Sequence, residues 1–341
     1  MTRTDASTRD RKAEHIDLAL DERMQLRSSF FDAWRFEHQA LPEVDFAEID
    51  VSTEFLGYRL QAPFLISCMT GGTGQATRIN HNLAIGAEET GIAVGVGSQR
   101  KALEDPAQAA SFQIRDLAPS VPLLGNLGAV QLNYGYDLAH CRAAVDMISA
   151  DALVFHLNPL QEAIQPEGDL DFSGLVEKLR DVAARLPVPV IAKEIGCGLS
   201  ARAGRALVEA GITILDTAGL GGTSWARIEA SRADDLELGE LFAGWGVPTP
   251  RSIRELAALP GVTVIGSGGV RNGLDAAKAI ALGADLVGIA QPFLTAATES
   301  PEAVAARARR TVRELKIAMF CVGARDLNEL RGARLLPARE A

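Results

Sequence analysis

The segment from His156 to Glu162 gathers side chains that could act on a small polar substrate. It contains a histidine, the carboxamides of Asn158 and Gln161, and the carboxylate of Glu162. One carboxylate supplies too few ligands for a dedicated metal cage, but it can hold Mg²⁺ together with waters and a substrate diphosphate. Taken singly, these residues have simpler explanations, namely a core histidine and a solvated glutamate at a helix start. Their clustering in one loop favours a binding site.

Lys193 directly follows the apolar run Val188–Ala192. A charged side chain at the end of a buried strand rarely points into a core without a partner. Its amine could form a Schiff base, contact a phosphate or stabilise an anionic ring. The simpler alternative is an ion pair with a neighbour such as Glu194. We favour a function, because perturbed titratable groups concentrate at functional sites.

Two glycine-rich segments are candidate anion sites. Gly266-Ser-Gly-Gly269 precedes Val270-Arg271, and its glycines allow the backbone to approach a phosphate closely. Gly219-Leu-Gly-Gly-Thr-Ser-Trp225 opens a long connection that reaches Pro250, and its threonine and serine offer hydroxyl donors. The simpler alternative for the first segment is a tight turn between a strand and a helix, and for the second a flexible loop without a function.

A cationic cluster, Arg11-Lys-Ala-Glu-His15, lies near the start of the chain. Such a cluster is most often a solvated face, but it could fold over a site and neutralise a substrate phosphate. We expect residues 1–11 to form a flexible polar arm. The spacing of apolar residues from His15 to Phe30 predicts a helix.

A regular alternation of elements begins at Pro63 and would position these residues. Eight short apolar runs recur, as expected of strands buried on both faces of a parallel sheet. The predicted strands are Phe64–Cys68, Ile92–Val96, Val121–Leu124, Ala152–Leu157, Val188–Ala192, Ile212–Leu215, Val262–Ile265 and Leu286–Ile289. The predicted helices are Asn80–Thr90, Ala107–Leu117, Leu138–Ile148, Leu175–Arg185, Ser200–Ala210, Arg251–Leu259, Leu274–Leu282 and Pro301–Phe320.

Eight strands alternating with eight helices over about 250 residues predict an α/β fold, a (β/α)₈ TIM barrel with an N-terminal helical extension. A doubly wound open sheet is the competitor, because periodicity alone does not show closure. We assign residues 1–60 to the N-terminal arm and extension, 61–325 to the barrel and 326–341 to a C-terminal tail. Barrel active sites lie at the carboxyl ends of the strands, where polar and glycine-rich segments follow each predicted strand.

Composition narrows the class of protein. The chain has 341 residues, of which 47% are hydrophobic and 23% charged, which excludes a disordered or fibrous chain. A net charge of −10 disfavours nucleic-acid binding. The four cysteines show no CxxC spacing, so neither a zinc site nor a disulfide framework is predicted. A polar N-terminus and the lack of a long apolar segment predict a cytoplasmic protein without a signal peptide or a membrane partner.

Seven motifs stand in order along the chain: Arg11-Lys-x-Glu-His15, Met69-Thr-Gly-Gly72, Gly97-Ser-Gln-Arg100, Gly125-Asn-Leu-Gly128, His156-Leu-Asn158 with Gln161-Glu162, Gly221-Gly-Thr-Ser-Trp225 and Gly266-Ser-Gly-Gly269. Together they resemble the type 2 isopentenyl-diphosphate isomerases, from about Arg11 to Arg325. Cys68, where a smaller residue is common, is a mild departure. The resemblance implies an FMN-dependent (β/α)₈ barrel that interconverts isopentenyl diphosphate and dimethylallyl diphosphate, using reduced flavin and Mg²⁺ with NAD(P)H as reductant.

The resemblance also implies roles for individual residues. FMN would be held by Cys68, Met69, Thr70, Ser98, Asn126, Lys193, Thr223, Gly268, Gly269, Val270, Ala290 and Gln291. The substrate, mainly its diphosphate, would contact Arg11, Lys12, His15, Ser98, Gln99, Arg100, His156, Asn158 and Gln161. Glu162 would bind Mg²⁺, and Lys193, His156 and Gln161 are the candidate catalytic residues. The family further suggests a homo-oligomer, either a tetramer or an octamer.

The implied reaction is a 1,3-proton shift without net redox change. An unactivated alkene is a poor base, so it needs a strong, well-placed acid, and a carbocation-like state must be shielded from water. Reduced flavin could supply that proton at N5, while Lys193 stabilises the anionic flavin. Arg11, Lys12, Arg100 and the Mg²⁺ on Glu162 would anchor the diphosphate and thereby orient the alkene.

Three other functions compete with this interpretation. An FMN-dependent oxidoreductase of the hydroxy-acid oxidase or glutamate synthase type should present a histidine with a nearby arginine after the sixth or seventh strand, and Asp216–Gly219 holds no such pair. A non-catalytic flavin or phosphate carrier has no reason to combine Glu162 with His156 and Gln161. An enzyme similar to inosine-monophosphate dehydrogenase needs a loop cysteine, and Cys197 stands in what looks like a βα turn.

Overall fold

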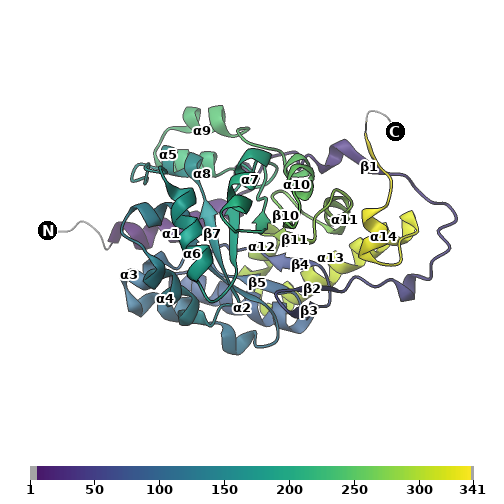
Figure 1. Cartoon of the computed structure of the whole chain (residues 1–341), viewed down its shortest axis with the longest axis horizontal. Helices are drawn as coiled ribbons and strands as arrows, with labels where there is room; N and C mark the ends of the chain where they lie inside the picture. The colour runs from purple at the N-terminus through teal and green to yellow at the C-terminus, as the bar shows by residue number, and fades with distance from the viewer. Residues whose placement is uncertain (1–5, 339–341) are drawn as a thin grey trace.

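The computed structural model describes residues 6–338, and side chains from residue 13 onward, as a closed parallel barrel wrapped by helices (Figure 1). The barrel strands are β4 (Phe64–Ile66), β5 (Ala93–Gly95), β6 (Leu123–Gly128), β7 (Ala152–Leu157), β8 (Val190–Glu194), β9 (Ile214–Asp216), β10 (Thr263–Ser267) and β11 (Leu286–Ile289). They pair in chain order, and β11 closes the ring by pairing with β4. This closure confirms the predicted (β/α)₈ barrel and excludes the open sheet.

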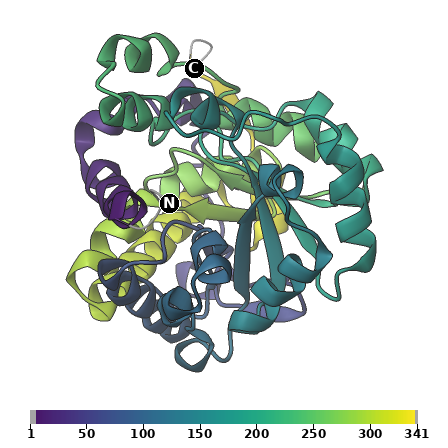
Figure 2. The same cartoon turned by 90° about the vertical axis from the view of Figure 1, so that its left-hand side faces the viewer.

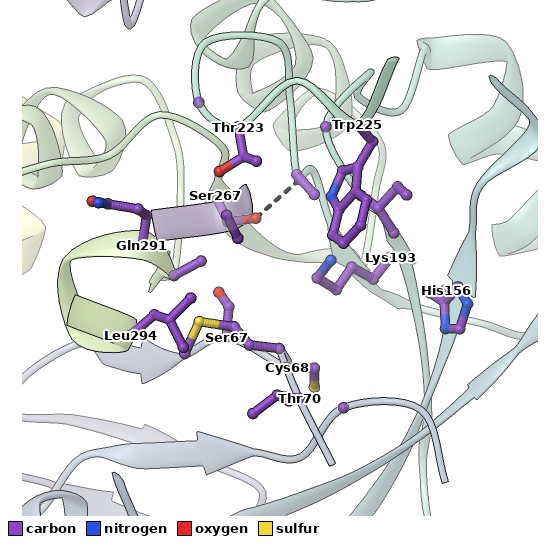
Figure 3. Close-up of a pocket in the computed structure, with 18 of the residues that line it drawn as sticks. Ser67, Cys68, Thr70, His156, Lys193, Thr223, Trp225, Ser267, Gln291 and Leu294 are labelled. Carbon is purple, nitrogen blue, oxygen red and sulfur yellow. Dashed lines mark hydrogen bonds between the residues drawn. The ribbon is translucent and has the colours of Figure 1, made fainter. Parts of the chain in front are cut away.

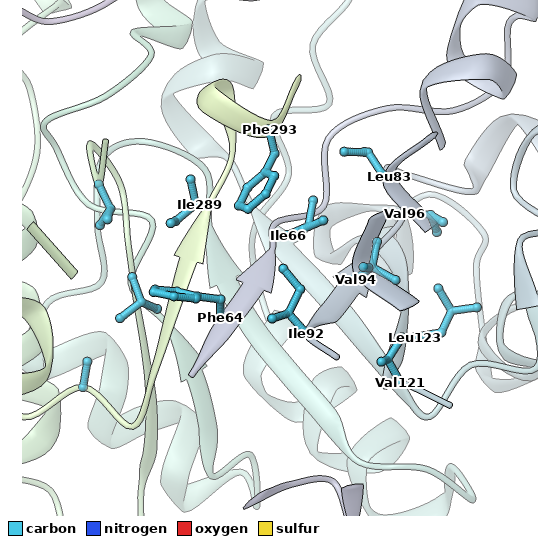
Figure 4. Packing of buried hydrophobic residues seen from close by; sticks show 14 of the residues in the cluster. Phe64, Ile66, Leu83, Ile92, Val94, Val96, Val121, Leu123, Ile289 and Phe293 are labelled. Atoms are coloured by element: carbon cyan, nitrogen blue, oxygen red, sulfur yellow. The ribbon is translucent and has the colours of Figure 1, made fainter. Parts of the chain in front are cut away.

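Each of the eight predicted apolar runs overlaps one barrel strand. Alternate residues face opposite ways, so Leu65 lies in the cluster inside the barrel while Phe64 and Ile66 lie in the larger cluster against the helices. Figure 4 shows this outer layer, where Ile66 and Val94 meet residues of the surrounding shell. Burial on both faces explains why the strands are apolar throughout rather than alternating.

Most of the predicted helices are present. They are α2 (Gly74–Thr90), α4 (Leu138–Ile148), α6 (Leu175–Arg185), α7 (Ala201–Glu209), α10 (Thr249–Ala257), α11 (Gly273–Ala281) and α13 (Pro301–Val322). The prediction of a helix over 107–117 is wrong: α3 (Arg100–Glu104) is followed by two 3₁₀ helices, η4 (Pro106–Ser111) and η5 (Arg115–Leu117). Tertiary contacts bend this segment, because Ser111 Oγ accepts a hydrogen bond from the Gly72 N–H and Phe112 is fully buried beneath the same loop.

The N-terminal extension differs from its prediction. Helix α1 spans Ala6–Leu20, so it begins inside the predicted arm and ends well before Phe30. The Asp21 carboxylate caps the short 3₁₀ helix η1 (Glu22–Met24) by accepting from the Arg23 N–H. Beyond it the chain pairs with the segment after β9 instead of continuing as a helix, since Leu26 N–H donates to the Gly222 carbonyl at 2.9 Å. Figures 1 and 2 show α1, in purple, at the end of the barrel where the long loops gather.

Four short helices follow barrel strands and shape that end. They are α5 (Pro159–Ile164), α8 (Trp225–Arg232), α9 (Leu236–Phe242) and α12 (Gln291–Glu299). Helices α8 and α9 occupy the long connection after β9, so this segment is not a plain flexible excursion. Helix α1 contacts both α8 and α12.

A hairpin of β2 (Thr53–Phe55) and β3 (Tyr58–Leu60) covers the opposite end of the barrel. Its Phe55 and Leu60 are buried in the same cluster as the inward residues of the strands. The barrel is therefore accessible from the carboxyl ends of the strands and plugged at the other end.

Outside the barrel, β1 (Trp34–Phe36) pairs antiparallel with β12 (Leu335–Pro337), so the extension and the C-terminal tail, with its helix α14 (Leu327–Arg331), are joined. The short 3₁₀ helices η2 (Phe31–Ala33), η3 (Phe46–Glu48) and η6 (Ala129–Asn133) complete the described elements. Over residues 6–338 the structure has no helix whose length and apolarity would allow it to cross a membrane.

Candidate active site

A cavity of 590 Å³ lies at the carboxyl ends of the barrel strands, and loops after all eight strands contribute to its wall. Most of the predicted site residues line it. They are His15, Cys68, Met69, Thr70, Ser98, Arg100, Asn126, His156, Asn158, Gln161, Glu162, Lys193, Thr223, Gly268, Gly269, Val270, Ala290 and Gln291. Figure 3 shows Lys193 of β8, His156 of β7, Thr223 of the loop after β9 and Gln291 at the start of α12 around this cavity.

Three predicted substrate contacts are not among these residues. The side chains of Arg11 and Lys12 lie outside the described part of the chain. Gln99 is described, and it does not line the cavity: its side chain is completely buried, its Nε2 donates to the Ala144 carbonyl at 2.8 Å, and its Oε1 accepts from the Asn126 N–H at 2.9 Å. Because both ends of its amide are used in the scaffold, Gln99 supports Asn126 instead of reaching a ligand.

One side of the cavity is made of backbone. Gly268 has φ +104°, and a Cβ there would lie 2.2 Å from the Gly219 carbonyl oxygen. A Cβ on Gly222 would lie 2.8 Å from the Gly269 nitrogen. Only glycines allow the loops after β9 and β10 to touch in this way. Beside them, helix α12 begins after Ala290 without a side-chain cap, which leaves its N-terminus facing the cavity and suited to a phosphate.

The extension fixes the loop after β9. Thr223 Oγ1 donates to Gln25 Oε1 at 3.0 Å, and the Ser224 N–H donates to the Met24 carbonyl at 2.8 Å. Arg271, which also lines the cavity, donates to the backbone carbonyls of residues 26, 27 and 221. These contacts make the N-terminal segment part of the cavity wall.

Lys193 is buried at the end of β8, and Figure 3 shows its amine in the cavity. Its Nζ donates to the backbone carbonyl of Glu194 at 2.7 Å. The Glu194 carboxylate instead accepts from backbone N–H groups of residues 195–198, so the predicted alternative, a side-chain ion pair between these two residues, is not formed. Burial raises the pKa of Glu194 and of Asp216, the residue opposite Lys193 on β9, although the Lys193 charge opposes both shifts.

Cys68 lies on the cavity wall near Lys193. Burial raises the pKa of its thiol to about 11, against an opposing effect of the Lys193 charge. The side chain therefore stays a neutral thiol at physiological pH. Its neighbour Ser67 also lines the cavity, and the Ser67 Oγ is buried without a hydrogen-bond partner among the described residues.

The opposite side of the cavity is made of polar side chains. His156 Nδ1 lies 2.9 Å from Asn126 Oδ1, which fixes the orientation of the ring. Asn158 Nδ2 donates to Gln161 Oε1 at 3.0 Å and to Glu162 Oε1 at 2.8 Å. The Asn158 Oδ1 is left buried with no partner among the described residues. An unsatisfied buried oxygen next to a carboxylate suits a cation, which would take both as ligands.

The residues that line this cavity fit both Mg²⁺ and FMN, the two groups that the family resemblance implies. Within the described residues, no three His, Cys, Asp or Glu side chains form a cluster able to hold a metal ion. The buried Glu162 and the free Asn158 oxygen nevertheless offer hard oxygen ligands to Mg²⁺, which commonly takes its other ligands from water and substrate phosphates. The glycine loops, the N-terminus of α12 and the free Ser67 hydroxyl likewise fit FMN.

Sequence reasoning missed several residues of this site. Ser67 had a usable signal, because it lies near the end of the first predicted strand, one position before the predicted FMN contacts. Gln25 and Leu294 line the cavity from a segment predicted as helix and from α12, which was not predicted. Glu229, which accepts a hydrogen bond from the cavity residue Gln161, lies in α8, a helix that was not predicted.

Comparison with known proteins agrees with this geometry. Residues 10–118 and 161–336 match the family model of the FMN-dependent dehydrogenases. The chain is 48% identical to the isopentenyl-diphosphate delta-isomerase of a Nostoc species, with 97% of this chain and 96% of the relative covered. It is 50% identical to that of Stutzerimonas stutzeri, over 96% of both chains, and 51% identical to that of Paracoccus zeaxanthinifaciens, over 94% and 95%.

Solved structures share the fold. A lactate oxidase from Pediococcus acidilactici has a TM-score of 0.67 at 17% identity, with 97% of this chain and 93% of the oxidase covered. A mandelate oxidase variant has a TM-score of 0.66, also at 17% identity, over 96% and 99%. Identities this low show the architecture alone, whereas the full-length relatives at about half identity show the family. The chain belongs to the FMN-dependent, type 2 isopentenyl-diphosphate delta-isomerases.

Proposed function

We propose that this protein interconverts isopentenyl diphosphate and dimethylallyl diphosphate by a 1,3-proton shift, with FMN in its reduced form, Mg²⁺ bound with the substrate, and NAD(P)H as the reductant. The proposal rests on one observation: the same cavity has a glycine-rich backbone wall on one side and a wall of polar side chains on the other. The glycine loops after β9 and β10 suit FMN, and the Asn158–Glu162 oxygen cluster, which follows β7, suits a magnesium diphosphate. The strand order sets β7 across the barrel from β11.

FMN would be held by its phosphate at the loop formed by Gly268, Gly269 and Val270 and at the N-terminus of α12. When bound in reduced form, it supplies an acidic proton at N5 and an electron-rich ring face. Lys193 holds a positive charge in the cavity with no carboxylate of the described residues within ion-pair distance. That charge stabilises an anionic ring and favours the reduced state.

The substrate diphosphate would bind on the opposite side. Arg100 lines the cavity at the edge of this cluster, where Asp169 lies 3.4 Å from its guanidinium and orients it. His15 and His156 face the same space from α1 and β7. Glu162 would bind Mg²⁺, and Arg11 and Lys12 stay predicted contacts. Anchoring the remote diphosphate orients the alkene, which is how binding energy is used to lower the barrier.

Apolar side chains would exclude water from the reacting carbon atoms. Trp225, Leu294 and Ile16 line the cavity, and the Trp225 ring packs edge-to-face on His15 with centroids 5.3 Å apart. A carbocation-like state survives only where no nucleophilic water reaches it. The extension therefore contributes shielding as well as contacts.

The oxidoreductase alternative has less support. The guanidinium of Arg271, the cationic side chain in the loop after β10, is bonded to backbone carbonyls and is not presented to a substrate carboxylate. No histidine follows β9 or β10 in the sequence. Similarity to hydroxy-acid oxidases concerns the fold alone. That the chain assembles as a homo-oligomer stays a prediction from the family resemblance.

The decisive experiment compares oxidised and reduced FMN protein. Isomerisation is followed by solvent-deuterium incorporation into isopentenyl diphosphate, with the flavin state checked by its visible spectrum. We expect exchange only after reduction by NADPH or dithionite, because the proton donor exists only in the reduced ring. Equal rates with oxidised FMN, or a protein that binds no FMN, would reject the proposal.

The metal assignment is tested by Glu162→Gln. We expect the Mg²⁺ concentration for half-maximal activity to rise by roughly tenfold or more, with FMN affinity unchanged, because the variant loses an anionic ligand. Glu167→Gln, an exposed glutamate of the same segment, is the control and should leave both quantities unchanged. A variant that loses FMN affinity but keeps its Mg²⁺ requirement would reassign Glu162 to the cofactor side.

A further inference from the structure

Glu229 is a buried carboxylate behind the cavity wall that the proposed reaction does not use. It belongs to α8, its side chain is 0% exposed, and it does not line the cavity itself. Gln161 Nε2 donates to its Oε1 at 2.6 Å, and His15 Nε2 lies 3.0 Å from the same oxygen. Arg232 Nη1 donates to its other oxygen at 2.6 Å. The carboxylate therefore joins α5, α1 and its own helix.

The contact with Gln161 determines which way that carboxamide points. An ionised carboxylate only accepts hydrogen bonds, so it selects the NH₂ end of the amide. The Gln161 Oε1 is thereby directed to Asn158, beside the proposed metal ligand. The Asn158 Nδ2, which donates to the Gln161 Oε1, selects the same orientation from the other end of the amide, so the carboxylate and Asn158 act together.

The contacts with His15 and Arg232 determine where α1 lies. Arg232 Nε donates to Glu14 Oε2 at 3.1 Å, so two adjacent residues of α1 are held by the pair formed by Glu229 and Arg232. Arg11 and Lys12 precede them on the same helix. Docking of α1 on α8 thus fixes the helix that carries the predicted diphosphate contacts.

The charge on Glu229 is permanent at physiological pH. Burial alone would raise the pKa of its carboxyl, but the attraction of His15 and the hydrogen bonds from Gln161 and Arg232 outweigh burial and lower the pKa to about 2. A group ionised at every working pH cannot carry a proton in catalysis near neutrality. Its effect must come through the groups that it orients.

We propose that Glu229 is a positioning residue: it fixes the direction of the Gln161 carboxamide and, together with Arg232, docks α1 over the mouth of the barrel. The kinetic part of this inference rests on the proposed isomerase function. The docking part does not, because it concerns the free FMN protein.

The test uses the full FMN-loaded chain and two variants. Glu229→Gln keeps the shape but has one acceptor oxygen in place of two, so it cannot satisfy Gln161 and Arg232 together. Glu14→Ala removes only the partly exposed contact of α1. Glu240→Ala is the matched control, because this exposed glutamate pairs with Arg227, the other arginine of α8, whose backbone contacts are with residues 23 and 25, beyond the end of α1.

Backbone hydrogen exchange over residues 13–20 is measured first, without substrate. We expect exchange to rise about tenfold in Glu229→Gln, by a smaller factor in Glu14→Ala, and not at all in Glu240→Ala. In the isomerase assay, kcat should fall about tenfold in Glu229→Gln, whereas Glu14→Ala should raise KM for the diphosphate with kcat unchanged.

Unchanged exchange of α1 in both variants would overturn the docking, and an unchanged kcat in folded Glu229→Gln would overturn the orienting role. If Glu229→Gln does not fold, hydrogen exchange in Glu14→Ala tests the docking of α1. The orienting role is then tested by Gln161→Glu, which places a second carboxylate against Glu229. This variant should lower kcat more than Gln161→Ala does. A wild-type protein without isomerase activity would refute the proposed function, while the exchange result would still stand.

Discussion

The two sides of the barrel mouth differ in whether backbone or side-chain atoms form them. The side formed by the loops after β9, β10 and β11 is largely backbone, and its shape depends on glycines that touch other backbone atoms. The side formed by β7, α5, α8 and α1 is a network of charged and amide side chains bonded to one another. We expect the first to bind its ligand by fit and the second by charge, so the two sides should respond differently to substitution, pH and salt.

The match to the family model follows this division only in part. The family model of the FMN-dependent dehydrogenases matches the segments that carry the glycine loops and leaves residues 119–160 unmatched. Those residues include His156 and Asn158, and also Asn126, a predicted FMN contact, whereas Gln161 and Glu162 lie in the matched part. A cofactor shared by many enzymes demands a constant cradle, whereas the substrate side can diverge with the reaction.

The largest expected effect is at the backbone side. Gly268→Ala puts a methyl group 2.2 Å from the Gly219 carbonyl oxygen at a positive φ, so the two loops must separate. We expect FMN affinity to fall by about a hundredfold or more, measured by quenching of flavin fluorescence. Gly135→Ala is the control: it has a similar φ of +92° but no atom within 4 Å, so it tests strain without the clash. Equal loss in both variants would show that backbone strain, and not contact between the loops, shapes the cradle.

An intermediate effect is expected where the two sides meet. Lys193→Met removes the positive charge from the cavity, so the midpoint potential of bound FMN should fall by roughly 30 mV or more, since for two electrons that shift equals about 1.4 kcal/mol. Equilibration with a reference dye measures it. Lys278→Met, another buried lysine that donates to a backbone carbonyl but lies outside the cavity, should leave the potential unchanged. A potential that does not move in Lys193→Met would place this amine away from the flavin.

A separate effect, on the stability of the fold and not on ligand binding, is a pH dependence of the charged side. Because the pKa of Glu229 is lowered from 4.5 to about 2, its ionised form stabilises the fold above pH 4.5, and this stabilisation is lost as the pH falls toward 2. The difference in unfolding free energy between wild type and Glu229→Gln should shrink by about 3 kcal/mol over this range. Urea unfolding at several pH values measures it. A constant difference would mean that the carboxylate is not held by its partners.

Residues adjacent in sequence were the easiest to place. Gly266–Gly269 and Gly219–Trp225 act through local backbone shape, so their motifs alone predict a place for an anion, and both segments line the cavity. Gln99 shows the limit, because its place in a motif did not reveal that its amide turns into the scaffold to hold Asn126. No motif indicated Glu229, since two of its three partners, His15 and Gln161, come from distant parts of the chain.

The amino-acid sequence by itself determined the eight apolar strands, their alternation with helices, and the polar residues that follow each strand, because burial on both faces and turn chemistry are local properties. Only the tertiary structure decided that the ring closes, that residues 24–26 pair with the loop after β9, and that α1 docks on α8 through Glu229 and Arg232. These outcomes depend on contacts between segments some two hundred residues apart, and their free energy exists only once the barrel has brought them together.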